Sequence, residues 1–129
     1  MRLLLDTHAL IWAIVAPDRL SEPARAALTA SSAEVYASHV SLWEMAIKRR
    51  IGKLDSLDRS ALDWFETYVP RSHMLQLPIA AAHVGAVEVL EAKHRDPFDR
   101  LLVAQAIHEG LTVVTGDELV SQYKVDSIW

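Results

Sequence analysis

Residues 1–16 read MRLLLDTHALIWAIVA. The apolar run of residues 2–5 is short and ends at Asp6, and residues 8–16 then form a longer, almost wholly apolar segment. A short apolar run followed directly by a longer one predicts a buried strand that leads into a helix. The first acidic residue of the chain therefore lies at the end of the first predicted strand.

The rest of the chain repeats this alternation of strands and helices. Further strands are predicted at 34–38 (EVYAS), 75–77 (LQL) and 111–115 (LTVVT). Start and stop residues predict the helices: Ser21 caps a helix to about residue 29, Ser41 caps one to about residue 51 before Gly52, and a helix over 60–69 stops at Pro70. Residues 79–92 read as a helix, and residues 94–109 as a capped helix that ends at Gly110.

Strands separated by helices need crossover connections, which favour parallel pairing. We therefore predict an α/β fold, a three-layer α/β/α sandwich around a mainly parallel sheet. The 129 residues contain no linker, repeat or low-complexity tract, so we expect one domain over residues 1–129.

The composition narrows the possible chemistry. The chain has no cysteine, so a metal would need oxygen or imidazole ligands. Its net charge of -4 argues against binding of nucleic acid by bulk electrostatics alone. The first apolar run is too short for a signal peptide or a membrane span, so we expect a soluble, cytoplasmic protein without a membrane partner.

Four acidic residues occupy positions where ligands gather in parallel sheets, beyond the carboxyl ends of the strands. Asp6 ends the first strand, Asp117 follows the 111–115 strand, and Glu44 and Asp99 each fall in the predicted first turn of a helix. Two carboxylates about 4 Å apart repel by roughly 4 kcal/mol at an effective dielectric of 20. A hard cation such as Mg²⁺ or Mn²⁺ removes this penalty and bridges phosphate oxygens, which implies a phosphate ester as substrate.

Each acid also has a purely structural interpretation. Ser41 and Glu44 have the spacing of a capping box, and acids in a first turn interact favourably with the helix dipole. Asp96 precedes Pro97 as an N-cap would, which places Asp99 at the third helical position. Asp117 could be a turn residue after Gly116, whereas Asp6, at the end of a buried strand, needs a partner.

Together, LLLDTHALIW, SLWEMAIK, HRDPFDRLLVAQA and TGD, followed by Trp129, resemble the PIN-domain proteins of the VapC toxin type. The resemblance covers nearly the whole chain, in the same order. It implies an α/β/α sandwich and a ribonuclease that cuts single-stranded RNA with Mg²⁺ or Mn²⁺. It also implies a toxin that is neutralised by a paired, VapB-like antitoxin.

The resemblance places the family's acids, as catalytic and metal-binding residues, on Asp6, Glu44, Asp99 and Asp117. Asp99 is preferred to Asp96 because it directly precedes the RLLVAQA helix. Small hydroxyl residues near the metal would be Thr7, Ser41 or Thr115, although each can also be a cap or turn residue. The resulting hypothesis is two-metal hydrolysis, with a 5′-phosphate and a 3′-hydroxyl as products.

Other residues near these acids are ambiguous. Lys48, Arg49, Arg50 and Lys53 could contact RNA phosphates, but Lys48 is also spaced for an ion pair with Glu44. Arg95 and Arg100 adjoin acids and could neutralise charge, although a solvated or ion-paired arginine is the default. His8 and His94 lie near the site without metal-ligand spacing, and His39, His73, His83 and His108 are expected in the core or on the surface. Trp12, Trp43 and Trp64 could stack on bases, but their apolar helices favour packing.

Two other functions have less support from the sequence. A haloacid-dehalogenase-like phosphotransferase also places an Asp after its first strand, but it needs a second acid where this chain has His8. A domain that only binds RNA gains nothing from clustered negative charge. The apolar segment 8–16 exceeds what a small core needs, so we expect part of it to be buried in a homodimer or under the antitoxin.

Overall fold

A computed structural model describes residues 1–55 and 57–129 and contains a five-stranded sheet in the order β3-β2-β1-β4-β5. All four strand pairs are parallel, with Leu4 opposite Tyr36 of β2 on one side and Val113 of β4 on the other. The strands are β1 (Arg2–Leu5), β2 (Glu34–Ser38), β3 (Leu75–Leu77), β4 (Thr112–Val114) and β5 (Ser127–Ile128). The predicted α/β fold with a parallel central sheet is confirmed.

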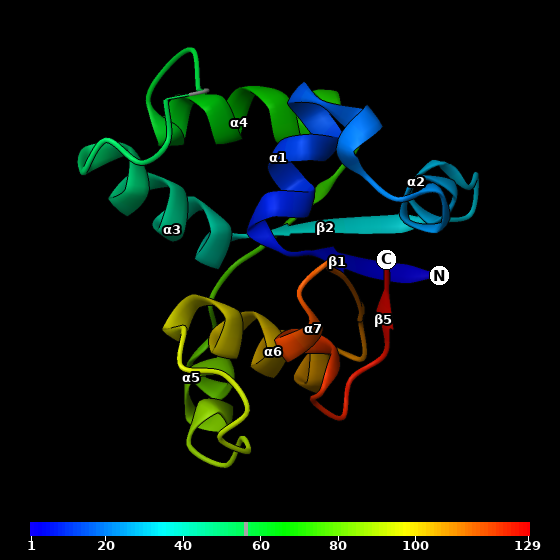
Figure 1. Ribbon diagram of the computed structural model, residues 1–129, viewed down its shortest axis with the longest axis vertical. Coiled ribbons are helices and arrows are strands. Elements are labelled where there is room, and N and C mark those ends of the chain that lie inside the picture. Colours follow the sequence, from blue (N-terminus) through cyan, green and yellow to red (C-terminus); the bar gives the residue numbers. More distant parts are fainter. Residues whose placement is uncertain (56) are drawn as a thin grey trace.

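Helices cover both faces of this sheet (Figure 1). They are α1 (Thr7–Val15), α2 (Glu22–Thr29), α3 (His39–Arg50), α4 (Ala61–Arg71), α5 (Ala81–Val87), α6 (Pro97–Glu109) and α7 (Glu118–Ser121), with a short 3-10 helix at Pro17–Arg19. In Figure 1, α1, α3 and α4 lie on one side of β1 and β2, and α5, α6 and α7 lie on the other.

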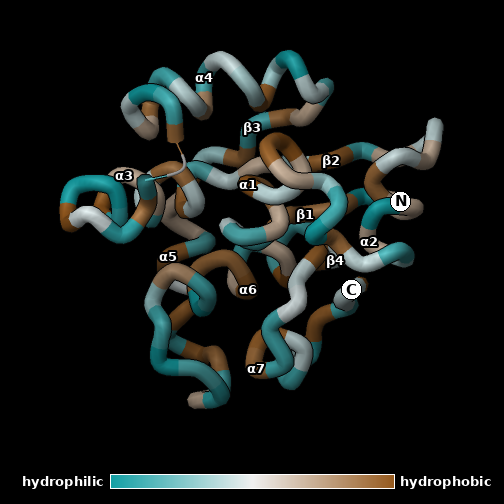
Figure 2. The backbone as a smooth tube through the Cα atoms, turned by 45° about the horizontal axis from the view of Figure 1, so that its top comes forward, coloured by the Kyte–Doolittle hydropathy of each residue, from teal (hydrophilic) through white to brown (hydrophobic). Residues whose placement is uncertain are grey.

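The central strand β1 supplies side chains to both hydrophobic cores. Leu3 and Leu5 pack with α1 and α4 residues such as Leu10 and Trp64, whereas Leu4 packs with α6 residues such as Leu102. All three leucines of β1 are fully buried. Figure 2 shows the same pattern, because the tube is hydrophobic along β1 and β4 and hydrophilic in the outer loops. A strand buried on both faces has to be apolar throughout, and residues 3–5 meet this requirement.

The start of α3 differs from the prediction. Ser38, the last residue of β2, is the N-cap, and its Oγ accepts a hydrogen bond of 2.9 Å from the backbone N–H of Val40. The predicted cap, Ser41, is fully buried within the helix, and Glu44 lies in the second turn rather than the first. The capping-box interpretation of Ser41 and Glu44 is therefore wrong, because the strand passes into the helix without a loop.

Other boundaries also differ. Helix α4 continues through Pro70 to Arg71, because a proline in the last turn removes one hydrogen bond without ending the helix earlier. Helix α5 covers only part of the predicted 79–92 segment. Arg100 donates to the carbonyl oxygens of Val87, the last residue of this helix, and of Glu91 in the loop that follows. The short elements α7 and β5 were not predicted.

The chain's own core covers much of α1. Leu10 and Ile11 are buried, Trp12 is half-buried, and the exposed positions are His8 and Val15. The surplus apolar surface that motivated the homodimer prediction is thus small, and the oligomeric state stays a prediction. Among the described residues, no helix combines the length and the hydropathy that crossing a bilayer requires.

Two glycines in helical contexts give opposite expectations for stability. Gly110 ends α6 with φ of 68°, in the left-handed region, whereas exposed Gly85 lies within α5 and a Cβ there would meet nothing within 4 Å. Gly110→Ala is expected to lower the free energy of unfolding by about 1 kcal/mol, and Gly85→Ala to raise it by about 0.5–1 kcal/mol. Urea unfolding of both variants measures this difference, and equal effects would contradict the assignment of Gly110 as the C-cap.

Candidate metal centre

The four predicted acids lie beyond the carboxyl ends of neighbouring strands. Asp6 follows β1 and caps α1, accepting a 2.8 Å hydrogen bond from the N–H of Ala9. Glu44 lies on α3, which directly follows β2, and Asp117 lies three residues after the end of β4. Because β1 is paired with both β2 and β4, these segments start from adjacent points on one edge of the sheet. Asp99 reaches the same region from the first turn of α6.

Asp6 is buried and supported by a neighbouring strand. Burial raises the pKa of the Asp6 carboxyl, and the charge of Glu44 adds to this effect. Hydrogen bonds from the Thr115 hydroxyl and the Ala9 N–H act in the opposite direction. Thr115 Oγ1 also accepts a 3.0 Å hydrogen bond from the N–H of Asp117, so one buried hydroxyl connects the backbone of Asp117 to the carboxylate of Asp6.

Glu44 is almost completely buried, with 3% of its surface exposed. Thr7 Oγ1 donates to its Oε1 at 2.7 Å and also lies 3.0 Å from Ser41 Oγ. The other carboxylate oxygen forms an ion pair with Lys48, one turn further along α3. A carboxylate held by a buried hydroxyl and a cation has a fixed orientation, so Thr7 and Ser41 line this site as the resemblance implied.

His94 brings the other two acids together. Its Nε2 lies 2.9 Å from Asp99 Oδ2 and 3.0 Å from Asp117 Oδ2. Its Nδ1 accepts a 3.1 Å hydrogen bond from the backbone N–H of Asp96. Since Nδ1 is the acceptor, the proton of the neutral ring is on Nε2, where it is shared by the two carboxylates.

This tautomer determines what His94 can do. The ligand atoms of His94, Asp99 and Asp117 lie within 4.8 Å of one another, which is close enough for one ion. A ring nitrogen that carries a proton cannot ligate a metal, so His94 acts here as a hydrogen-bond donor to the acids. The expectation that His94 is not a metal ligand stays a prediction, and the sequence did not predict that His94 lies between two of the acids. The signal was available, because His94 precedes the Asp96 cap by two residues.

Asp99 experiences the combined charge of the site. Burial and the charges of Asp96, Glu44 and Asp6 raise the pKa of Asp99 to about 7, although His94 opposes the rise. The effect of both Glu44 and Asp6 on the pKa of Asp99 indicates that the fold has brought α3, α6 and the start of α1 together. Asp117 joins them through His94.

The donor chemistry fits a hard divalent cation. Carboxylates and hydroxyls supply only oxygen, and crowded carboxylates with raised pKa values are groups that a cation stabilises in their charged form. A second group that could hold an ion, formed by His83, His108 and Glu109, does not fit. His83 Nδ1 accepts a 3.0 Å hydrogen bond from the N–H of Ala80, so its Nε2 carries the proton that is donated to Glu109.

The structure distinguishes Asp96 from Asp99. Asp96 is the N-cap of α6 and accepts hydrogen bonds from the N–H groups of Phe98 at 2.8 Å and Asp99 at 3.3 Å. Arg100 is neither solvated nor ion-paired as expected, because it donates to backbone carbonyls and to Tyr123 Oη. Both residues therefore shape the start of α6.

The remaining candidates lie at the surface or in the core. The ion pair between Lys48 and Glu44 is the structural interpretation that the spacing allowed. The other basic residues of this group, Arg49, Arg50 and Lys53, are exposed, as is Arg95. Trp64 is buried in the core, and Trp43 packs edge-on against Phe98 with ring centroids 4.6 Å apart.

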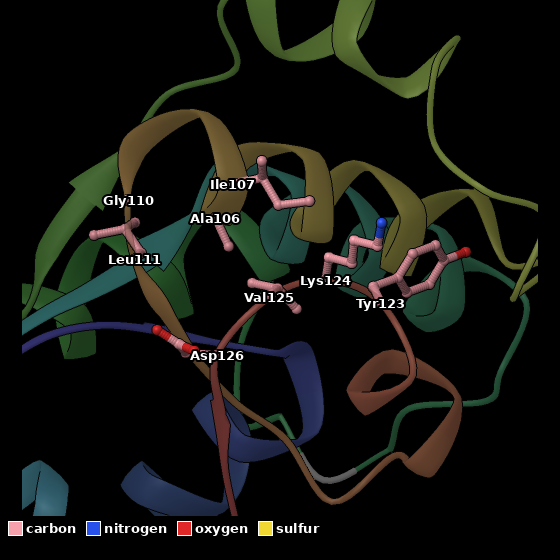
Figure 3. Close-up of a pocket in the computed structure, with 8 residues that line it drawn as sticks. All are labelled: Ala106, Ile107, Gly110, Leu111, Tyr123, Lys124, Val125 and Asp126. Carbon is pink, nitrogen blue, oxygen red and sulfur yellow. The ribbon is translucent and has the colours of Figure 1, made fainter.

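The cavities differ in their relation to the acids. A cavity of about 450 Å³ lies between the C-terminal part of α6 and residues 123–126, and Figure 3 shows Lys124 and Tyr123 on its rim. None of the four acids lines it. A cavity of about 410 Å³ is lined by Asp6 and Asp117 together with His8, Trp12 and Trp129. The second cavity is therefore the one that adjoins the candidate metal centre.

A parallel sheet with carboxylates gathered at its carboxyl edge defines an α/β protein with an acidic, oxygen-lined site that could hold a cation. The sequence matches the PIN domain over residues 3–126. The chain therefore belongs to the PIN-domain family, as the resemblance predicted.

Solved structures agree with this fold. VapBC2 from Rickettsia felis, bound to a DNA fragment from its promoter, matches with a TM-score of 0.71 at 16% identity over 99% of this chain and 98% of that chain. DNA-bound VapBC from Salmonella typhimurium gives 0.70 at 19% identity over 99% and 97%. FitAcB from Neisseria gonorrhoeae gives 0.57 at 18% over 98% and 96%. A comparison with curated proteins gave no match.

The raised pKa of Asp99 predicts a pH-dependent stability in the absence of metal. A carboxyl whose pKa rises from 3.8 to about 7 on folding stabilises the folded state below pH 4, and this contribution is lost as the pH rises to 7. Between pH 5 and pH 8 the free energy of unfolding should therefore fall less for the Asp99→Asn protein than for wild type, by about 2 kcal/mol. Urea unfolding in EDTA at both pH values measures the difference.

The exposed Asp126 provides a matched control, since Asp126→Asn makes the same change of charge at a residue of the other cavity, which none of the four acids lines. Its pH dependence should equal that of wild type. An Asp99→Asn protein with the pH dependence of wild type would contradict the crowding of charge around Asp99.

Proposed function

We propose that this protein is a metal-dependent endoribonuclease and acts as the VapC-type toxin of a toxin-antitoxin pair. The supporting observation is the convergence of Asp6, Glu44, Asp99 and Asp117 at one edge of the sheet, where the pKa of Asp99 rises to about 7. A fold does not maintain such repulsion without a benefit, and a bound divalent cation is the simplest one. Membership in the PIN-domain family supports nuclease chemistry.

In this proposal the four carboxylates hold Mg²⁺ or Mn²⁺. Oxygen atoms of Asp99 and Asp117 are already close enough to share one ion, and Asp6 and Glu44 add charge beside them. When bound, the ion neutralises charge on a phosphodiester and lowers the pKa of water for hydrolysis. The side chains around the four acids would keep the carboxylates charged and oriented for this ion.

Three neighbouring residues perform that orientation. Thr7 fixes Glu44, Thr115 fixes Asp6, and the Nε2–H of His94 holds Asp99 and Asp117. His94 is thus a positioning residue. Donors around metal-binding carboxylates commonly change metal affinity by about 10- to 100-fold when they are removed.

The proposed substrate is single-stranded RNA, with a 5′-phosphate and a 3′-hydroxyl as products. The net charge of -4 argues against binding of RNA by bulk electrostatics, so phosphate contacts would come from the bound cation and from local basic residues. Exposed Arg49, Arg50 and Lys53 at the end of α3 are candidates, because α3 also carries Glu44.

The proposed partner is a VapB-like antitoxin, and we further propose a cytoplasmic homodimer. Two of the similar structures are VapBC complexes on DNA. We infer that this chain likewise pairs with a small DNA-binding protein that blocks the acidic site until RNA cleavage is required.

Removal of divalent cations tests the proposed chemistry. Purified protein should cleave single-stranded RNA with added Mg²⁺ or Mn²⁺ and lose this activity in excess EDTA, because the proposed ligands are all carboxylates. Activity should return when the cation is restored. Full cleavage in EDTA would contradict metal dependence, and no cleavage with either cation would favour a domain that only binds RNA.

Asp99 and Asp96 provide a matched pair of variants on one helix start. Asp99→Asn should reduce cleavage by at least about 100-fold and weaken the rise in melting temperature caused by Mn²⁺, because the charge that attracts the cation is lost. Asp96→Ala should cost about 0.5–2 kcal/mol of stability through the lost cap but retain much of the specific activity. If only the Asp96 variant lost the stabilisation by Mn²⁺, Asp96 rather than Asp99 would be the metal ligand.

A further inference from the structure

The cavity beside Asp6 and Asp117 has two chemically different kinds of lining residue. These two acids contribute carboxylates to the lining, and Trp12, Trp129 and His8 contribute aromatic rings. Its volume of about 410 Å³ falls within the ~300–1,000 Å³ that is usual for small-molecule sites. A ligand that fills it would need a group that is compatible with the acids and their cation. It would also need a flat, uncharged ring system. A nucleotide has both parts.

The aromatic wall is formed by two indoles. The ring centroids of Trp12 and Trp129 lie 5.9 Å apart with the planes tilted by 49°, and the ring of His8 lies 5.7 Å from Trp12. Trp129 is 38% exposed and Trp12 is half-buried, so part of each ring remains available to a ligand. The tilt means that the two indoles are not stacked face to face on one another, and aromatic faces are the surfaces on which nucleobases stack.

The backbone holds Trp129 in place. The preceding residue, Ile128, pairs with Val114 of β4, and its carbonyl accepts a 3.1 Å hydrogen bond from the N–H of Thr115. A Cβ at Gly116 would lie only 2.9 Å from the indole, so the ring rests directly against the backbone of the segment that leads to Asp117. A ring that is already fixed loses little conformational entropy when a base stacks on it.

Arg19 supplies positive charge at the edge of this wall. Its guanidinium carbon lies 4.8 Å above the ring of Trp12, and the side chain is exposed. Within residues 1–55 and 57–129, no carboxylate forms an ion pair with Arg19. An arginine stacked on an indole remains free to contact a phosphate of a bound strand.

We propose that this indole cavity, lined by Trp12, Trp129 and His8 beside Asp6 and Asp117, binds a nucleobase adjacent to the phosphate that is cut. This inference rests on the proposed ribonuclease function, because it places the sugar-phosphate backbone at the acids. Stacking is insensitive to charge, which explains how a chain with a net charge of -4 gains affinity for RNA at an acidic site. Both indoles present flat faces and few polar groups, so the cavity tolerates different bases.

The test separates base binding from backbone binding. Two labelled eight-residue probes, oligoadenylate and an oligomer of abasic ribose phosphate, carry the same charge and differ only in their bases. Asp99→Asn protein serves as the background, because it is expected not to cleave. Fluorescence anisotropy with Mn²⁺ should give about 5- to 100-fold tighter binding of oligoadenylate than of the abasic oligomer.

Variants at the indoles should remove this preference. Trp129→Leu or Trp12→Leu in the same background is expected to reduce the affinity for oligoadenylate toward that for the abasic oligomer and to leave the latter unchanged. Trp129→Phe keeps a ring and should retain most of the preference, provided that melting curves show a folded protein. Trp43→Leu removes an exposed indole outside the cavity and should bind both probes as the background does.

Three results would overturn the inference: equal binding of both probes by the background protein, an unchanged preference in the Trp129 and Trp12 variants, or an equal loss in Trp43→Leu. If the indole variants instead weaken self-association in light scattering while RNA binding is unchanged, the cavity belongs to a protein interface. The wild-type cleavage assay is a separate measurement. Cleavage without a base preference leaves the ribonuclease proposal intact, whereas a base preference without cleavage contradicts only the enzymatic proposal.

Discussion

Burial of carboxylates close to one another is the constraint around which this edge of the sheet is built. Burial is the larger cause of the raised pKa values of Asp6 and Asp99, and the charges of neighbouring carboxylates add to it. The fold limits this cost locally. A threonine hydroxyl supports Asp6 and another supports Glu44, Lys48 pairs with Glu44, and His94 bridges Asp99 and Asp117. These contacts leave oxygen atoms close together, which is the property that a hard cation requires.

The segment 94–105 shows how one stretch of sequence serves both stability and the site. Asp96 caps α6, and its backbone N–H also fixes the tautomer of His94. Arg100 donates hydrogen bonds to the backbone carbonyls of Val87 and Glu91 and so stabilises the loop before α6. Gln105, fully buried one to two turns later, accepts a hydrogen bond from Ser38, the residue that ends β2 and caps α3. The helix that presents Asp99 is thus attached to the helix that presents Glu44 by a buried polar contact.

The indole cavity and the acids are connected by the same strand pair. Thr115 and Gly116 follow β4, and they support Asp6 and Trp129 respectively. The cavity therefore combines aromatic rings with carboxylates, and the proposed nucleotide ligand would use both. A polynucleotide strand fits this description better than a metal-binding metabolite without a ring, because both walls then contribute to binding.

Sequence alone determined the fold class, and it predicted which acids lie at the carboxyl ends of the strands. Apolar runs ended by Asp6 or followed by Asp117 specify buried parallel strands with polar residues at their ends, because side-chain burial and chain direction are local properties of the pattern. Only tertiary structure decided that β2 runs directly into α3 with Ser38 as its cap, that His94 bridges Asp99 and Asp117, and that Trp129 packs beside Trp12 in the lining of a cavity. The sequence places His94 two residues before the Asp96 cap, but it does not show that Asp117, 23 residues further on, reaches the same ring. The approach of Asp117 to His94 and of Trp129 to Trp12 arises from packing across the sheet, so no local pattern contains it.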